Sequence, residues 1–97
     1  MAKRLNMLIT GAGITIGKDP RNDVVVTNKY VSHQHAFISL NDGKLTIVNR
    51  NSTNGTEFSI SGSEWIKVKG VVTIPFIDGG TKIRLAGTEI FDLVPTV

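Results

Sequence analysis

The chain has 97 residues, of which 40% are hydrophobic, and its eleven lysines and arginines exceed its eight acidic residues by a formal charge of +3. This length fits one small domain over residues 1–97 with one hydrophobic core. The sequence has no cysteine, which excludes disulfides, thiolate nucleophiles and cysteine-based zinc sites. It is therefore compatible with a cytoplasmic location, and the basic balance mildly favours anionic partners.

The N-terminal segment superficially resembles a signal peptide, because a basic start at Lys3-Arg4 precedes an uncharged run from Leu5 to Gly17. Asn6, Thr10 and two glycines dilute that run. No segment approaches the roughly 18 apolar residues of a membrane span. We expect a soluble protein without a membrane span.

Short apolar runs between turn residues predict an all-β fold, an antiparallel sandwich or barrel. The first two runs, Leu5–Ile9 and Ile14–Ile16, flank a glycine-containing turn and predict a hairpin. Ala36–Leu40 and Leu45–Val48 flank Asn41-Asp42-Gly43, a stronger hairpin signal. The other predicted strands are Val24–Val26, Thr56–Ile60, Trp65–Val68, Val71–Ile74, Lys82–Leu85 and Glu89–Val94.

Alternation along these runs predicts which side chains form the core, since successive strand residues point to opposite faces. Trp65 is expected either in the core or covering an edge. The polar clusters between runs are expected to be loops on a rigid scaffold, where binding residues concentrate. The predicted inward set is Ala36, Ile38, Leu40, Ile83, Leu85, Ile90 and Leu93.

Three of these loops carry the hydroxyl, amide and cationic groups that hold phosphate. They contain Ile16-Gly17-Lys18, Ser32-His33-Gln34-His35 and Asn51 to Thr56. In this order and spacing, with Asn22-Asp23-Val24 between the first two, they resemble the Gly-Arg, Ser-x-x-His and Asn-Gly pattern of the forkhead-associated (FHA) domain.

A later segment, Gly80 to Ala86, is similar to the Gly-Asp-x-Ile-x-Leu-Gly of the same family, with Thr81 and Ala86 replacing its aspartate and last glycine. The resemblance runs from about residue 14 to residue 93. It implies a β-sandwich of about ten or eleven short strands that binds phosphothreonine peptides on loops at one end.

The resemblance also implies roles for individual residues. The serine bonds the phosphate, the asparagine holds the peptide backbone, and the histidine braces the loops. The implied phosphopeptide-binding residues are Lys18, Ser32, His33, Thr53 and Asn54. Those shaping the loops are Gly17, His35 and Gly55, and those open to a role in peptide specificity are Arg21, Tyr30 and Arg50. Lys29 is a further loop cation, although a solvated surface charge is the commoner role for such residues.

Lys18 departs from the family, which has arginine at this position. Lysine keeps the charge but loses the planar fork that clasps two phosphate oxygens. We expect weakened binding or a shifted pose. The alternative is a degenerate scaffold that binds an unphosphorylated partner or assembles a larger complex such as a secretion apparatus.

Other functional classes fit less well. Ser32, a histidine and an aspartate could imitate a hydrolytic triad, but the sequence has no Gly-x-Ser-x-Gly elbow, so we expect no enzyme. The dispersed aromatic residues do not suggest a nucleic-acid surface. His33 and His35 lack the further ligands that zinc requires, so we expect neither metal nor cofactor. The expected partner is a phosphothreonine-containing protein, a Ser/Thr kinase or its substrate.

Overall fold

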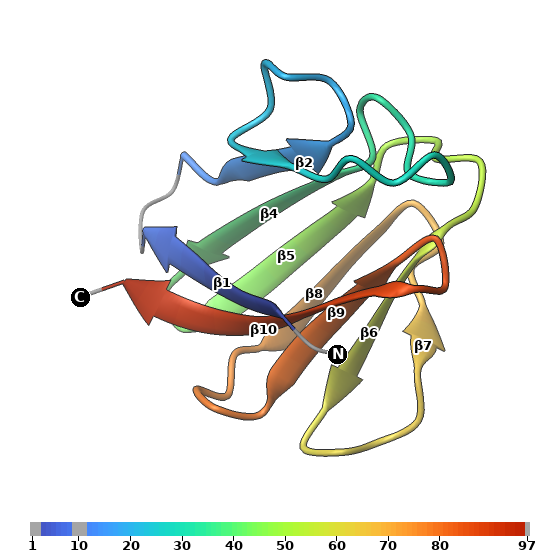
Figure 1. The fold of residues 1–97 in the computed structure, drawn as a ribbon. Coiled ribbons are helices and arrows are strands. Elements are labelled where there is room, and N and C mark those ends of the chain that lie inside the picture. The colour runs from blue at the N-terminus through green and yellow to red at the C-terminus, as the bar shows by residue number, and fades with distance from the viewer. Residues whose placement is uncertain (1–2, 9–11, 97) are drawn as a thin grey trace.

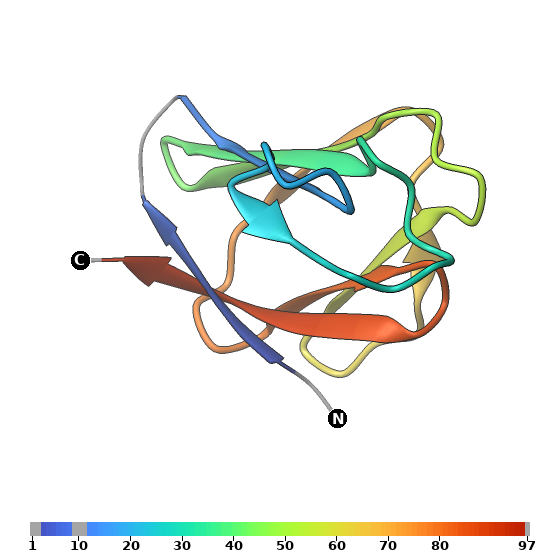
Figure 2. The same cartoon turned by 45° about the horizontal axis from the view of Figure 1, so that its top comes forward.

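The computed structural model describes residues 3–8 and 12–96, and these residues form ten strands. Two five-stranded sheets face each other as a sandwich (Figures 1 and 2). The predicted all-β fold is confirmed. The described ranges contain no helix that could cross a membrane.

Each sheet combines strands that are distant in the sequence. Two of the pairings, β1 with β10 and β2 with β3, are parallel, and the others are antiparallel. In spatial order the first sheet contains β1 (Lys3–Leu8), β10 (Glu89–Thr96), β9 (Thr81–Leu85), β6 (Thr56–Ile60) and β7 (Ile66–Lys67). The second contains β3 (Val24–Val25), β2 (Ile14–Gly17), β4 (Ala36–Asn41), β5 (Lys44–Asn49) and β8 (Val71–Pro75).

The first predicted hairpin is wrong. β1 pairs with β10 in the first sheet, whereas β2 pairs with β4 in the second. Ile9 and Gly11, which belonged to that prediction, lie outside the described residues. Glycines permit a sharp change of chain direction, but they do not specify whether the next strand returns beside the last or enters another sheet. The partner of β1 lies more than eighty positions along the chain, where local turn chemistry cannot identify it.

The second predicted hairpin is confirmed. β4 and β5 pair in register from Ala36 opposite Asn49 to Asn41 opposite Lys44. The two residues between them, Asp42 and Gly43, have φ of 51° and 72°. Positive φ at both central positions is the requirement of a type I′ turn, whose twist matches that of the strands.

The core lies between the sheets, and Ala36, Ile38 and Leu40 point into it as predicted. The prediction that Ile90 points inward is wrong. Ile90 lies three residues before the buried Leu93 on β10, and residues three apart on one strand face opposite sides of the sheet. Phe91 and Leu93 of β10 are buried, at 5% and 1% exposure.

Trp65, expected in the core or over an edge, precedes the edge strand β7. The Arg84 guanidinium lies 4.5 Å from the centre of its ring, and that guanidinium also donates to Glu57. The tryptophan therefore covers the outer face of the first sheet.

Candidate functional site

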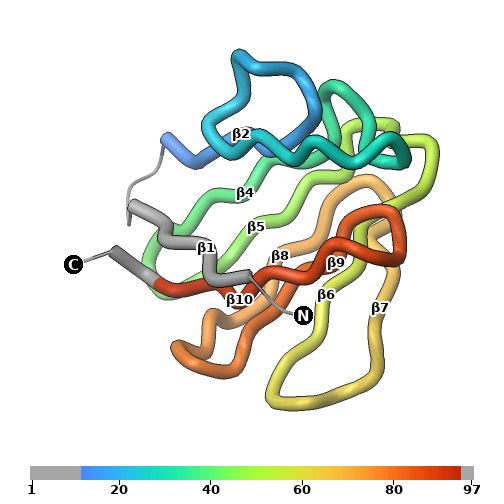
Figure 3. Tube along the Cα trace, viewed as in Figure 1, coloured from blue at the N-terminus to red at the C-terminus, as the bar shows by residue number. Residues whose placement is uncertain are grey.

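The loops after β2, after β3 and after β5 meet at one end of the sandwich (Figure 3). Between them lies a pocket of about 290 Å³. All five of the predicted phosphopeptide-binding residues line it. Its full lining is Lys18, Lys29, Tyr30, Val31, Ser32, His33, Thr53 and Asn54.

Gly17 at the end of β2 lets the first two loops touch. A Cβ at this position would lie 2.2 Å from the backbone oxygen of His33, so no larger residue fits without a shift. The Asn22 amide donates to the same oxygen (2.7 Å) and to the backbone oxygen of Asp19 (2.9 Å). The Lys18 N–H donates to the backbone oxygen of Ser32 at 3.0 Å, which places these two candidate residues side by side.

The second loop is shaped by Asn28. Its side-chain oxygen accepts from the Tyr30 N–H at 2.8 Å, as in an Asx-turn, and its backbone oxygen accepts from the Val31 N–H at 3.0 Å. Val31 is buried and anchors the loop to the core. Tyr30 is 53% exposed and lines the pocket.

His35 ties the second loop to the third. Its side chain is fully buried. Nδ1 accepts from the Ser32 N–H (3.0 Å), so the ring proton resides on Nε2, which donates to the Gly55 oxygen (2.8 Å). The bond at Nδ1 requires a neutral imidazole, because an imidazolium carries a proton on that nitrogen and cannot accept there. Burial lowers the pKa of His35 below its usual 6.5 and so favours this form, while the bond to Gly55 acts in the opposite direction.

The third loop turns at Gly55, whose φ is +85°. The Ser52 hydroxyl accepts from the Gly55 N–H at 3.2 Å and donates to the Asn49 side chain. The Thr53 N–H donates to the Ser32 hydroxyl oxygen (3.1 Å), and the Asn54 amide donates to the backbone oxygen of Tyr30 (2.8 Å). The candidate residues of two loops are thereby bonded to one another.

Arg21 and Arg50, which the sequence leaves open to a role in peptide specificity, do not line the pocket. Arg21 is paired with Asp19 at 2.7 Å and its side chain is 85% exposed. Hydrogen bonds from Arg21 lower the pKa of Asp19 to about 2. The Arg50 guanidinium donates to the Gln34 side chain at 3.0 Å.

The two histidines face different surroundings, since His35 is buried and His33 is exposed. Their side chains therefore do not lie together on one face, as two ligands of the same metal ion would. The described residues contain no group of three histidine, cysteine or acidic side chains placed to hold a metal ion.

Sequence reasoning did not identify Asn28 and Asn49, which brace the loops from outside the motifs, and it placed Asn22 in the family pattern without giving it a role. Asn28 carried a usable signal, because asparagine two residues before a turn position commonly forms an Asx-turn. Asn49 sits at the end of a strand and gave no such signal. Lys29 lines the pocket but could not be separated from an ordinary surface lysine by its sequence context.

Comparison with known proteins matches the FHA domain model to residues 14–64, which is more than half of the chain. No curated protein sequence matches the chain significantly. The crystal structure of the FHA domain of the CT664 protein from Chlamydia trachomatis is 26% identical, with a TM-score of 0.63. The alignment covers 80% of this chain and 71% of that one.

Mycobacterium tuberculosis EmbR in complex with a low affinity phosphopeptide is 25% identical, with a TM-score of 0.63. That alignment covers 89% of this chain but 21% of EmbR, so the chain spans about a fifth of that protein. A structure from an analysis of phosphothreonine-dependent FHA domain interactions is 24% identical, with a TM-score of 0.58 and coverage of 80% and 72%. Since the family match and the sandwich fold agree over these residues, the chain belongs to the FHA domain family.

Proposed function

We propose that the chain is a phosphothreonine-peptide-binding module that mediates phosphorylation-dependent protein–protein interaction in signalling. Domains of its family are interaction modules, and we infer that this chain is not an enzyme. The observation that carries the proposal is the convergence of Lys18, Ser32, His33, Thr53 and Asn54 on one pocket. The phosphopeptide complex of EmbR supports the same ligand class.

In this proposal Lys18 and the Ser32 hydroxyl contact the phosphate. The Ser32 oxygen already accepts from Thr53, which leaves its own proton for the ligand. Asn54 uses one amide proton on Tyr30 and keeps the other for the peptide backbone. His33 stands exposed at the rim, and Gly17, His35 and Gly55 hold the loops in place.

A phosphate carries nearly two negative charges, and each charge-assisted hydrogen bond contributes about 1.5 to 3 kcal/mol. Two or three such bonds must offset the ordering of a flexible peptide. We therefore expect roughly micromolar affinity.

We propose that the chain acts in the cytoplasm and that its partner is a phosphothreonine-containing protein, a Ser/Thr kinase or its substrate. Residues 1–97 act in this proposal as a single domain. The second candidate function is a scaffold that binds an unphosphorylated partner or assembles a larger complex such as a secretion apparatus. Lys18 favours that candidate, because an ammonium lacks the bidentate geometry of arginine.

Affinity selection from a degenerate phosphothreonine peptide library, followed by calorimetry, distinguishes the two candidate functions. The selected peptide is compared with its phosphoserine and unmodified threonine forms. We expect the phosphothreonine form to bind at least tenfold more tightly than the unmodified form, and Ser32→Ala to remove most of that difference. Equal binding of all three forms would instead support the scaffold.

A further inference from the structure

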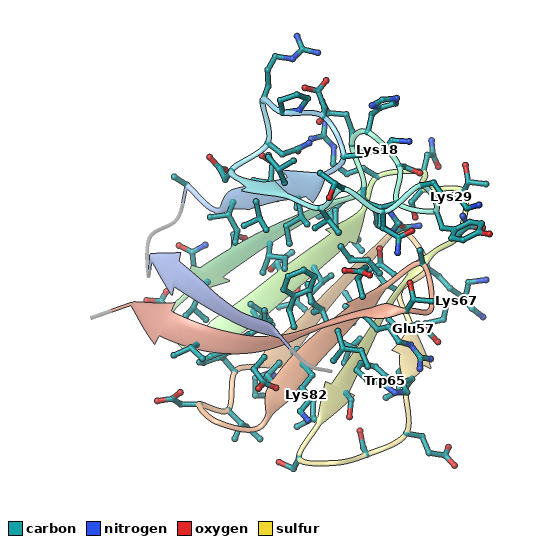
Figure 4. The ribbon with its side chains drawn as sticks, viewed as in Figure 1. Lys18, Lys29, Glu57, Trp65, Lys67 and Lys82 are labelled. Atoms are coloured by element: carbon teal, nitrogen blue, oxygen red, sulfur yellow. The ribbon has the colours of Figure 1, made fainter. Side chains whose placement is uncertain are left out.

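The charged side chains that line the pocket are all cationic. Its eight lining residues include two lysines, Lys18 and Lys29, and no acidic side chain. The loop arginines are engaged elsewhere, Arg21 with Asp19 and Arg50 with Gln34. Two ammonium groups therefore supply the fixed positive charge of the pocket, and they come from different loops, one after β2 and one after β3 (Figure 4).

Lys29 is held in place at the pocket by an aromatic ring. Its Nζ lies 5.1 Å from the centre of the Tyr30 ring, within the range of a cation–π contact. The Tyr30 backbone is fixed at both ends, its N–H on Asn28 and its oxygen on the Asn54 amide. The ring contact restrains the lysine while leaving its N–H protons for hydrogen bonds.

Most of the backbone N–H groups around the pocket are already in use. Among the eight lining residues, five donate their backbone N–H within the loops: Lys18, Tyr30, Val31, Ser32 and Thr53. A dianion entering the pocket would therefore depend mainly on side-chain donors. The two ammonium groups are the strongest of these, because bonds from charged donors are about twice as strong as neutral ones.

We propose that Lys29 is a second phosphate-binding residue, which holds the phosphate together with Lys18, and that Tyr30 positions it. This inference rests on the proposed function. Two point charges on separate loops here replace the single planar fork that an arginine would provide. Lys29 then compensates for the lysine at position 18. Binding remains phosphate-dependent although Lys18 lacks the bidentate geometry of arginine.

The test measures the affinity of the selected phosphothreonine peptide and of its unmodified form for Lys29→Ala, with Lys44→Ala as the control. Both variants remove one exposed lysine, but Lys44 lies on the β4–β5 hairpin away from the pocket. We expect Lys29→Ala to weaken binding of the phosphorylated peptide about tenfold and binding of the unmodified peptide by less than twofold. Lys44→Ala should change either affinity by less than twofold, and Lys29→Arg should retain most of the affinity for the phosphorylated peptide.

The positioning role of Tyr30 is tested by a double-mutant cycle. Tyr30→Phe keeps a ring beneath the ammonium and should retain the ratio of phosphorylated to unmodified affinity. Tyr30→Ala should lower that ratio severalfold in the parent and leave it unchanged in Lys29→Ala. Equal losses of that ratio in both backgrounds would remove the positioning role.

The outcomes separate the inference from the proposed function. If Lys29→Ala behaves like Lys44→Ala while Ser32→Ala abolishes phosphate dependence, the proposed function stands and Lys29 is not a phosphate ligand. If the parent protein shows no preference for the phosphorylated peptide, both fail.

Discussion

At the scale of single residues, His35 shows how a titratable group can serve as a fixed structural part. Its two ring nitrogens bond the Ser32 N–H and the Gly55 oxygen, one as acceptor and one as donor. A proton on Nδ1 would remove the acceptor and place a charge in a fully buried position. The neutral form is therefore part of the architecture of the site.

This predicts that stability depends on pH. The pKa of His35 is lowered by burial in the folded protein, whereas the unfolded chain binds the proton near 6.5. Below that pH the unfolded state holds more protons than the folded state, so the free energy of unfolding falls as the pH drops from 6.5 toward the folded pKa. The slope for one proton cannot exceed about 1.4 kcal/mol per pH unit, and urea unfolding at several pH values between 7.5 and 5.5 would measure it.

The matched variants are His35→Asn and His33→Asn. Removal of the buried histidine should flatten this pH dependence and lower stability by about 2 to 4 kcal/mol at pH 7.5, because two buried hydrogen bonds and their packing are lost. His33→Asn, at the exposed rim, should keep the slope of the parent. A pH-independent parent protein would contradict the assignment.

At the scale of elements, the end of β2 depends on close contact between loops. Gly17→Ala would bring a Cβ to within 2.2 Å of the His33 oxygen and 2.9 Å of the Asn22 amide. Backbone must move, so we expect a loss of stability of about 1 to 3 kcal/mol together with at least tenfold weaker binding of the phosphothreonine peptide.

Gly43→Ala is the control for that variant. Gly43 has a φ of +72°, but its Cβ would meet nothing within 4 Å, and it lies in the β4–β5 turn. We expect a stability cost of about 1 to 2 kcal/mol from the left-handed backbone and no change in peptide affinity. Calorimetry and urea unfolding on both variants would measure these effects. A Gly17→Ala protein with unchanged affinity would show that the contact does not shape the site.

Elements also show where sequence reasoning succeeds. Asn41-Asp42-Gly43 specifies a local hairpin because both turn residues need positive φ, and the structure has it. The environment of β1 depends on a partner at the other end of the chain, and no local pattern encodes it. The misplacement of Ile90 had a different origin, since parity alone could have corrected it.

At the scale of the whole molecule, stability comes from one core that both sheets share. Leu45 in β5 is completely buried in it. Leu45→Ala should lower the free energy of unfolding by about 2 to 5 kcal/mol, a large part of the 5 to 15 kcal/mol typical of a domain. Val71→Ala in the neighbouring β8, where the side chain is 60% exposed, should change it by about 0.5 kcal/mol or less. Urea unfolding of the two variants would measure the contrast, and equal losses would contradict the assignment of the core.

The fold of the whole molecule explains how much of the candidate site can be predicted from the sequence. The five motif residues were named from the sequence because the family spacing places them on three loops, and the fold brings those loops together. The motif could not reveal that Arg21 turns to Asp19 or that Arg50 turns to Gln34. An exposed side chain can bond to any of several neighbours. Which one it bonds to depends on distances in the folded protein, and spacing along the sequence does not give these distances.

The braces of the site share one property, which is that most of their partners are main-chain atoms. Asn22 binds two backbone oxygens, His35 binds a backbone N–H and a backbone oxygen, and Asn54 binds a backbone oxygen. Every residue type except proline offers these same atoms. Side chains at Tyr30, His33 and Thr53 can therefore be exchanged during evolution without dismantling the loops, so new ligand preferences can arise in this domain while its scaffold stays constant.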